Sequence, residues 1–245
     1  MVCLDRKQEV WSALNVVTDP EIDESVVSLD FVTAVKVDSN NRVEIDFRLP
    51  TYWCAPNFAF LMASDMRDAV TALEWVSEVS VKLFDHFSAD LINRGVALRQ
   101  DFRDAFPGET DDDLSAVRQK FLGKAFERRQ ELLLRYLLAR GFSPDYIARA
   151  RLSDLLHLPM DPEGASLRNL YLFILRRIKP DIEEEAPAFT TLGRMPLASR
   201  DLKGYLRKIA AVRRDAEFNG FFCRSLLSER EQRSRSENPD TETTR

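Results

Sequence analysis

One stretch of the N-terminal third decides the fold, and it spans residues 16–87. It reads VVTDPEIDESVVSLDFV at 16–32, AVKV at 34–37, VEIDF at 43–47, LPTYWCAP at 49–56 and VSVKLF at 79–84. Strict alternation of apolar and polar residues predicts strands, whereas apolar residues spaced three and four apart predict a helix. The stretch therefore alternates between the two kinds of element and contains a single cysteine, Cys54, in its central loop.

The predicted elements follow in the order helix, strand, strand, helix, strand. Residues 5–16 favour a first helix, and the turn-forming residues DSNN at 38–41 join the next two runs into a predicted β-hairpin. Pro56 suits the first turn of a helix. It opens an apolar stripe on one helical face, formed by Phe58, Leu61, Met62, Met66, Val70 and Leu73. The sequence predicts an α+β domain over residues 1–105, with one face of a small sheet covered by helices.

The remainder predicts an all-α helical domain over residues 106–228. Thr110, followed by three aspartates, favours the start of a helix that continues to Arg140, where Gly141 suits its C-terminal end. Further apolar stripes at 167–178 and 202–212 predict additional helices around an irregular, proline-containing crossing at 180–198. Residues 229–245 contain almost no apolar side chains, so we expect a disordered tail there.

Charge and composition exclude several classes of partner. The first 106 residues contain 18 acidic and 10 basic residues, which argues against nucleic acid as a ligand of this part. No stretch approaches 18 uninterrupted apolar residues, and no secretory signal is recognisable, so we expect a cytoplasmic protein without a membrane-spanning helix. The chain has three cysteines, an odd number without motif spacing, which argues against a disulfide framework.

Cys54 is the main candidate for chemistry. It lies at a predicted helix start, where the positive end of the helix dipole favours a thiolate, the form that binds metals. One thiolate cannot complete a tetrahedral site, so a homodimer, nearby carboxylates or transient binding would have to supply the rest. Asp19 and Glu21, in the turn around Pro20, are candidate additional metal ligands; the alternative is a proline turn with capping acids.

Three other residues have both a functional and a structural interpretation. His86 could add a nitrogen ligand, although a single histidine between aromatic residues is also typical of a structural role. Tyr52 and Trp53 flank Cys54 and could form a docking patch for a partner protein, or they could belong to the core. Cys223 falls within an apolar helix and is expected to be inert.

The first domain resembles the SufT/PaaD-type iron–sulfur cluster assembly domain over about residues 5–87. The resemblance rests on Asp19-Pro20-Glu21-Ile22, on Ser25-Val26-Val27-Ser28-Leu29, on Thr51 with Cys54, and on Val79-Ser80-Val81. The chain departs from the family pattern at two places. Asp30 stands where the family usually carries glycine, and Ala55 separates Cys54 from Pro56.

The resemblance implies an accessory factor that matures an iron–sulfur cluster or iron centre of a client metalloenzyme. Cys54 would handle iron or a transient iron–sulfur cluster, and the helical domain would recognise the client. Long relatives with appended helices are similar to accessory proteins of iron-dependent oxygenases, which makes such an oxygenase one candidate client.

Two other functions stay open. The first is a metal-free adaptor or chaperone that binds a client through the aromatic loop and the helical domain. The second is a cysteine-dependent enzyme, but no acid or histidine stands at a recognisable spacing and no nucleotide-binding, zinc-protease or serine-hydrolase motif is present. We therefore do not expect an enzyme.

Overall fold

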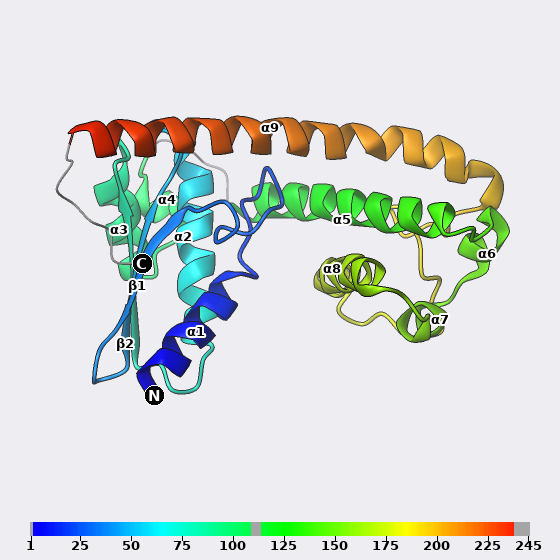
Figure 1. The fold of residues 1–245 in the computed structure, drawn as a ribbon, viewed down its shortest axis with the longest axis horizontal. Coiled ribbons are helices and arrows are strands. Elements are labelled where there is room, and N and C mark those ends of the chain that lie inside the picture. Colours follow the sequence, from blue (N-terminus) through cyan, green and yellow to red (C-terminus); the bar gives the residue numbers. More distant parts are fainter. Residues whose placement is uncertain (1, 109–113, 238–245) are drawn as a thin grey trace. The chain divides into compact units, whose positions relative to one another are not determined.

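The computed structural model describes residues 2–108 and 114–237. The first part of the chain forms α1 (Val2–Leu14), β1 (Val32–Val37), β2 (Arg42–Arg48), α2 (Pro56–Thr71), β3 (Glu78–Phe84), α3 (Ala89–Ala97) and α4 (Phe102–Ala105). The three strands form one sheet in the order β1-β2-β3 (Figure 1). The predicted α+β class, including the hairpin and the helix beginning at Pro56, is confirmed.

The sheet combines two kinds of pairing. Strands β1 and β2 are antiparallel, as expected for a hairpin, whereas β2 and β3 are parallel, from Arg42 opposite Glu78 to Arg48 opposite Phe84. Helix α2 supplies the crossover that a parallel pair requires. Because parallel strands end at the same edge of a sheet, the loop after β2 and the segment after β3 both start at that edge.

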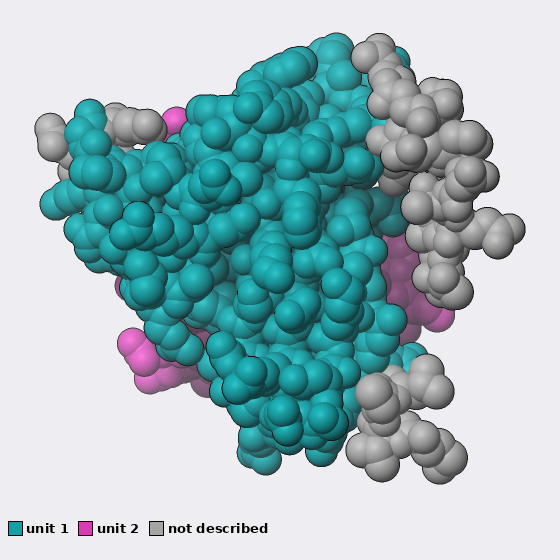
Figure 2. Space-filling view, turned by 90° about the vertical axis from the view of Figure 1, so that its left-hand side faces the viewer, with its two compact units in different colours: residues 1–117, 217–245 teal, residues 118–216 magenta. Residues whose placement is uncertain are grey.

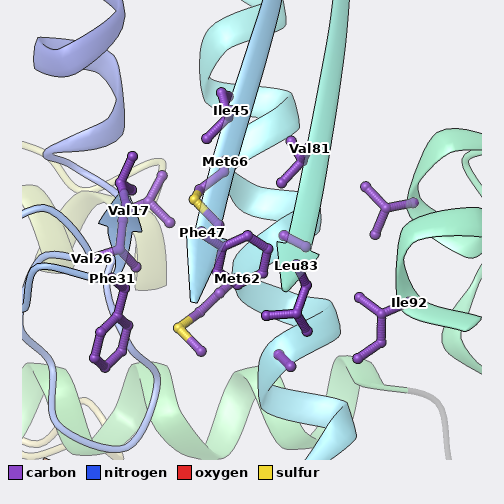
Figure 3. Packing of buried hydrophobic residues seen from close by; sticks show 14 of the residues in the cluster. Val17, Val26, Phe31, Ile45, Phe47, Met62, Met66, Val81, Leu83 and Ile92 are labelled. Carbon is purple, nitrogen blue, oxygen red and sulfur yellow. The ribbon is translucent and has the colours of Figure 1, made fainter. Parts of the chain in front are cut away.

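The core of this part lies between the sheet and its helices. Every second residue of β2 is buried, ending with Phe47, which is 0% exposed. Figure 3 shows Met62 and Met66 of α2 beside Phe47, with Leu83 of β3 next to them. The alternation of β2 and the stripe of α2 therefore describe two sides of one interface, as the sequence predicts.

Asp30 has a left-handed backbone conformation, with φ of 56°. It follows Leu29 directly before β1, and it stands where the resembled family carries glycine. Aspartate is one of the few residues with a side chain that adopts this conformation readily. The substitution is thus compatible with the same backbone turn.

The second part of the chain is helical. It contains α5 (Leu114–Ala139), α6 (Pro144–Arg149), α7 (Leu152–His157), α8 (Pro162–Ile178), the 3-10 helix η1 (Ser199–Asp201) and α9 (Leu202–Glu237). Gly141 follows α5 with φ of 89°, and the Ser143 hydroxyl accepts a hydrogen bond from Tyr146 N at the start of α6. The predicted helix start at 110–113 lies outside the described residues. Among those residues, no helix combines the length and apolarity needed to cross a bilayer.

The chain divides into two compact units, coloured separately in Figure 2. The first unit contains residues 1–117 together with 217–245, and the second contains residues 118–216. This division differs from the predicted domains 1–105 and 106–228, because the last turns of α9 belong to the first unit, where Leu227 is buried in the core. Helix α9 continues to Glu237, into the segment 229–245 for which the sequence predicts a disordered tail, and residues 238–245 of that segment lie outside the described residues.

Gly95 provides a test of the packing in the first unit. A Cβ atom at this position would lie 2.6 Å from Ala105 Cβ and 2.9 Å from a ring carbon of Phe60. Since the Ala105 Cβ is fixed to the backbone, Gly95→Ala should overpack the contact between α3 and α4. We expect the free energy of unfolding to fall by about 1–3 kcal/mol.

Tryptophan fluorescence in a urea titration measures this effect, because Trp11, Trp53 and Trp75 all belong to the first unit. Gly204→Ala is the matched control. It changes a helical glycine of the second unit that has no atom within 4 Å of the added Cβ. An unchanged urea midpoint for Gly95→Ala would contradict the packing described above.

Candidate functional site

Cys54 lies in the loop that joins β2 to α2, which we call the cysteine loop (residues 49–55). Its thiol is half-buried and lies 3.0 Å from Thr51 Oγ1. Ala55 caps α2 and Pro56 is the first helical residue, so Cys54 precedes the cap by one residue. Cys54 therefore lies just before the helix and not in its first turn. Its sulfur forms a hydrogen bond with the Thr51 hydroxyl.

His86 fixes the backbone of this loop. Its Nε2 lies 2.7 Å from the Cys54 carbonyl oxygen, and its Nδ1 accepts a hydrogen bond from Ser88 N at 3.1 Å. Because Nδ1 accepts, the ring hydrogen is on Nε2, which donates to Cys54. Burial lowers the pKa of His86, which favours this neutral form. Both ring nitrogens are therefore engaged, and His86 positions Cys54 instead of presenting a free nitrogen to a metal.

A second hydrogen bond joins the same two segments and creates an aromatic surface. Phe87 N donates to the Tyr52 carbonyl at 3.1 Å, and the two side-chain rings lie 6.2 Å apart. Tyr52 is 54% exposed, Trp53 73% and Phe87 52%. These three residues form what we call the aromatic patch. Sequence reasoning named Tyr52 and Trp53 but missed Phe87, which the parallel pairing of β2 and β3 places beside them.

Asp19 organises the preceding acidic turn (residues 19–24). Its Oδ1 accepts hydrogen bonds from Glu21 N at 2.8 Å and Ile22 N at 2.9 Å, and its own backbone N donates to the Glu24 carbonyl. Asp19 is only 8% exposed, whereas Glu21 is exposed. Burial raises the pKa of Asp19 to about 6, although the two backbone donors act in the opposite direction.

Cys223 of α9 belongs to the same neighbourhood, which sequence reasoning did not foresee. The Cys223 and Cys54 side chains are both half-buried and pack against the same hydrophobic core. Burial, followed by electrostatic effects of Asp19, Cys54 and Glu21, raises the pKa of Cys223 to about 12. Its thiol therefore stays protonated at neutral pH, and it brings a second sulfur near the acidic turn and the cysteine loop.

The candidate ligands do not form a preassembled metal centre. Within residues 2–108 and 114–237, no group of three or more His, Cys, Asp or Glu side chains is placed to hold a metal ion. A resident four-ligand cluster site therefore does not fit the described part of one chain. Within the described residues, a metal held at Cys54 would therefore lack a complete set of His, Cys, Asp or Glu ligands.

The pKa of Asp19 makes a specific prediction for Asp19→Asn. The amide oxygen can keep both backbone hydrogen bonds, but the side chain no longer ionises. In the wild type the folded-state pKa lies above the ordinary value, so the folded protein binds more protons between pH 4 and 6. The free energy of unfolding should therefore fall as the pH rises through this window.

The difference between 3.8 and about 6 corresponds to at most roughly 3 kcal/mol. Urea titrations from pH 4 to 7 should show the wild type losing stability relative to Asp19→Asn by up to this amount. Asp38→Asn is the control, because Asp38 accepts similar backbone hydrogen bonds on the exposed hairpin turn. Parallel pH profiles for the wild type and Asp19→Asn would refute the effect.

Comparison with known proteins concerns the N-terminal region of the chain. The sequence model of a family described as iron–sulfur cluster assembly protein matches residues 7–82. An uncharacterized protein of Methanocaldococcus jannaschii is 31% identical over 87 residues, which cover 36% of this chain and 90% of that protein. The family match includes Asp19 and Cys54, whereas His86 and Cys223 lie beyond it. Through its N-terminal region, the chain belongs to the iron–sulfur cluster assembly protein family.

Proposed function

We propose that the chain is an accessory factor that carries iron or an iron–sulfur unit to a client metalloenzyme, with Cys54 as the carrying residue. The observation that supports this most directly is the way Cys54 is held. Its carbonyl is fixed by buried His86 while its thiol remains half-exposed in a loop bordered by the aromatic patch. A positioned but accessible thiol suits the transfer of a bound group.

Transient carriage suits the ligand set better than a resident cofactor. The described residues offer no three-ligand group, so the cargo would keep some ligands from its donor or gain them from its acceptor. A second copy of the chain could also supply a thiolate, which makes a homodimer part of the proposal. On this proposal, iron or the iron–sulfur unit is a substrate that passes through the site.

We do not propose catalytic turnover. His86 is a titratable base hydrogen-bonded to the Cys54 backbone, but its nitrogens are occupied by Cys54 and Ser88. A general base needs a free position within hydrogen-bond reach of the proton it removes. A cytoplasmic location and an iron-dependent oxygenase as the client stay predictions from the sequence.

The exposure of the aromatic patch favours a second candidate, a metal-free adaptor. Trp53 is 73% exposed, and exposed tryptophan and tyrosine side chains frequently supply much of the binding energy of protein interfaces. On this alternative, the patch and the helical unit bind a client protein, and the Cys54 thiol has a structural role. The two candidates differ in whether Cys54 or Trp53 is indispensable.

Cys54→Ser tests the first candidate. After anaerobic reconstitution with iron and sulfide, the wild type should bind iron and show visible charge-transfer absorption, and Cys54→Ser should lose both. The reason is that a serine hydroxyl stays protonated and is a poor ligand for iron at neutral pH. Metal analysis, absorption spectra and circular dichroism measure binding and folding together.

Cys3→Ser is the matched cysteine control and should keep the absorption. Equal iron content in the wild type and Cys54→Ser would remove Cys54 from the proposed role. Absence of iron from both proteins, with intact folding, would favour the adaptor.

Trp53→Ala tests docking independently. We expect it to lower the recovery of an iron-containing client in affinity purification from the native host by about tenfold or more, the range for an aromatic interface residue. Iron binding after reconstitution should be unchanged, since Trp53 does not contact the cargo on this proposal. Leu98→Ala, at another exposed apolar position of the first unit, is the control. Full client recovery with Trp53→Ala would exclude the patch as the docking surface.

A further inference from the structure

The last turns of α9, residues 217–237, bind the acidic turn. We call this segment the strap; it is the orange-to-red end of α9 in Figure 1. A Cβ at Gly220 would lie 3.1 Å from Ile22 Cγ2, so the helix backbone comes close to the turn at this point. One helical turn further, Arg224 Nη1 donates to Glu24 Oε2 at 2.6 Å. Two successive turns of the strap thus contact the two ends of the segment 22–24.

Arg230 binds the other two segments that surround Cys54. Its Nη1 donates to the Leu49 carbonyl at 2.7 Å, where the cysteine loop begins. Its Nη2 donates to the Asp85 carbonyl at 3.1 Å and lies 3.1 Å from the Asp85 carboxylate. Asp85 directly precedes His86, the residue that holds the Cys54 carbonyl. One side chain therefore links both backbone segments that position the cysteine.

Cys223 lies on the same face of the strap as these contacts. Gly220, Leu227 and Arg230 lie three, four and seven residues from Cys223, which places all four along one side of a helix. Leu227 is buried in the core of the first unit, and Cys223 packs against that core as Cys54 does. The electrostatic effect of Cys54 on the pKa of Cys223 agrees with this placement.

The contacts described for the strap depend on a small number of side chains. Among the described side chains of the strap, Leu227 is the one that is buried in the core. The ion pairs that Arg224 and Arg230 form are partly open to water. In the first pair the side chains of Arg224 and Glu24 are 48% and 25% exposed, and in the second those of Arg230 and Asp85 are 21% and 57% exposed. Partly exposed ion pairs contribute little to stability and weaken with salt. Segments with few buried contacts open locally without global unfolding.

We infer that the strap is a displaceable cover that controls access to the Cys54 thiol. Closed, it ties the acidic turn, the cysteine loop and the His86 segment together and keeps Cys54 half-buried. Open, it exposes the thiol and the surface beside it to a partner. The inference depends on the proposed function only for the identity of the cargo or partner that reaches Cys54. The covering of the thiol itself does not involve a metal.

Alkylation of Cys54 tests the cover in the full-length chain. The rate of modification by N-ethylmaleimide is followed by mass spectrometry of the Cys54 peptide, under anaerobic conditions and without added metal. The double variant Arg224→Ala/Arg230→Ala should raise this rate about three- to tenfold, as expected for losing two partly exposed ion pairs. Arg214→Ala, at an exposed position of the same helix, should leave the rate unchanged.

A disulfide lock makes the test decisive. A Cβ at Gly220 would lie 3.1 Å from Ile22 Cγ2, which is one bond from Ile22 Cβ, so Ile22→Cys/Gly220→Cys should form a disulfide on oxidation. Peptide mapping verifies the linkage. Cys54 should then be alkylated several-fold more slowly in the oxidised protein than in the same protein after reduction and desalting. This comparison is made within one variant, so its own effect on folding cancels.

Equal Cys54 rates in the locked and reduced forms would overturn the inference, as would an unchanged rate in the double arginine variant. Neither result depends on iron. A strap that passes both tests while Cys54→Ser keeps full iron binding would leave the cover standing and refute the proposed carrier function.

Discussion

The parallel pairing of β2 with β3 is the constraint on which the site depends. The register from Arg42 opposite Glu78 to Arg48 opposite Phe84 leaves no freedom in where the two strands end. The cysteine loop must leave the sheet where β2 ends, and the His86 segment must leave it beside that point. The hydrogen bond from His86 Nε2 to the Cys54 carbonyl, across 32 positions of the chain, follows from this geometry. A one-residue slip of β3 would also turn its buried face toward solvent, so the core protects the site's register.

This dependence explains how much of the site the sequence could predict. The hairpin, α2 and the run at 79–84 were readable because each has a periodicity that only one element satisfies. Together they imply the crossover, and the crossover implies that His86 approaches Cys54. Periodicity does not reveal whether a histidine nitrogen is free or bonded, however. Only the three-dimensional structure shows that both His86 nitrogens are hydrogen-bonded. This changes the interpretation of His86 from a candidate metal ligand to a residue that positions Cys54.

The contribution of α9 was beyond sequence reasoning for a different reason. An apolar stripe shows that a helix packs, but it does not say against which surface. The contacts of Arg224 and Arg230 with the N-terminal segment of the first unit bridge 145 to 200 positions of the chain, and each depends on a single side chain. No local pattern distinguishes these arginines from their exposed neighbours on the same helix. The expected boundary at residue 228 consequently placed the whole strap with the helical domain.

The two departures from the family pattern have different physical consequences. Asp30 adopts the left-handed conformation that glycine would adopt, so the turn before β1 is compatible with the change. Ala55 has a larger effect, because it takes the capping position and moves Cys54 one residue away from the helix. A thiol outside the cap depends less on the helix dipole, which acts mainly within the first turn. The environment of the Cys54 thiol must then be set by tertiary contacts.

Those tertiary contacts come from elements outside the matched region. Thr51 meets the thiol within the loop itself, but His86 and Arg230 both lie beyond residue 82, where the family match ends. A carrier has two opposing requirements: its ligand must be protected between transfers and open during them. In a domain whose cysteine has left the helix cap, a covalently tethered helix meets both requirements, since its effective concentration favours closure and its few buried contacts permit release. On this argument, the C-terminal helix is part of the site and not an appendage to it.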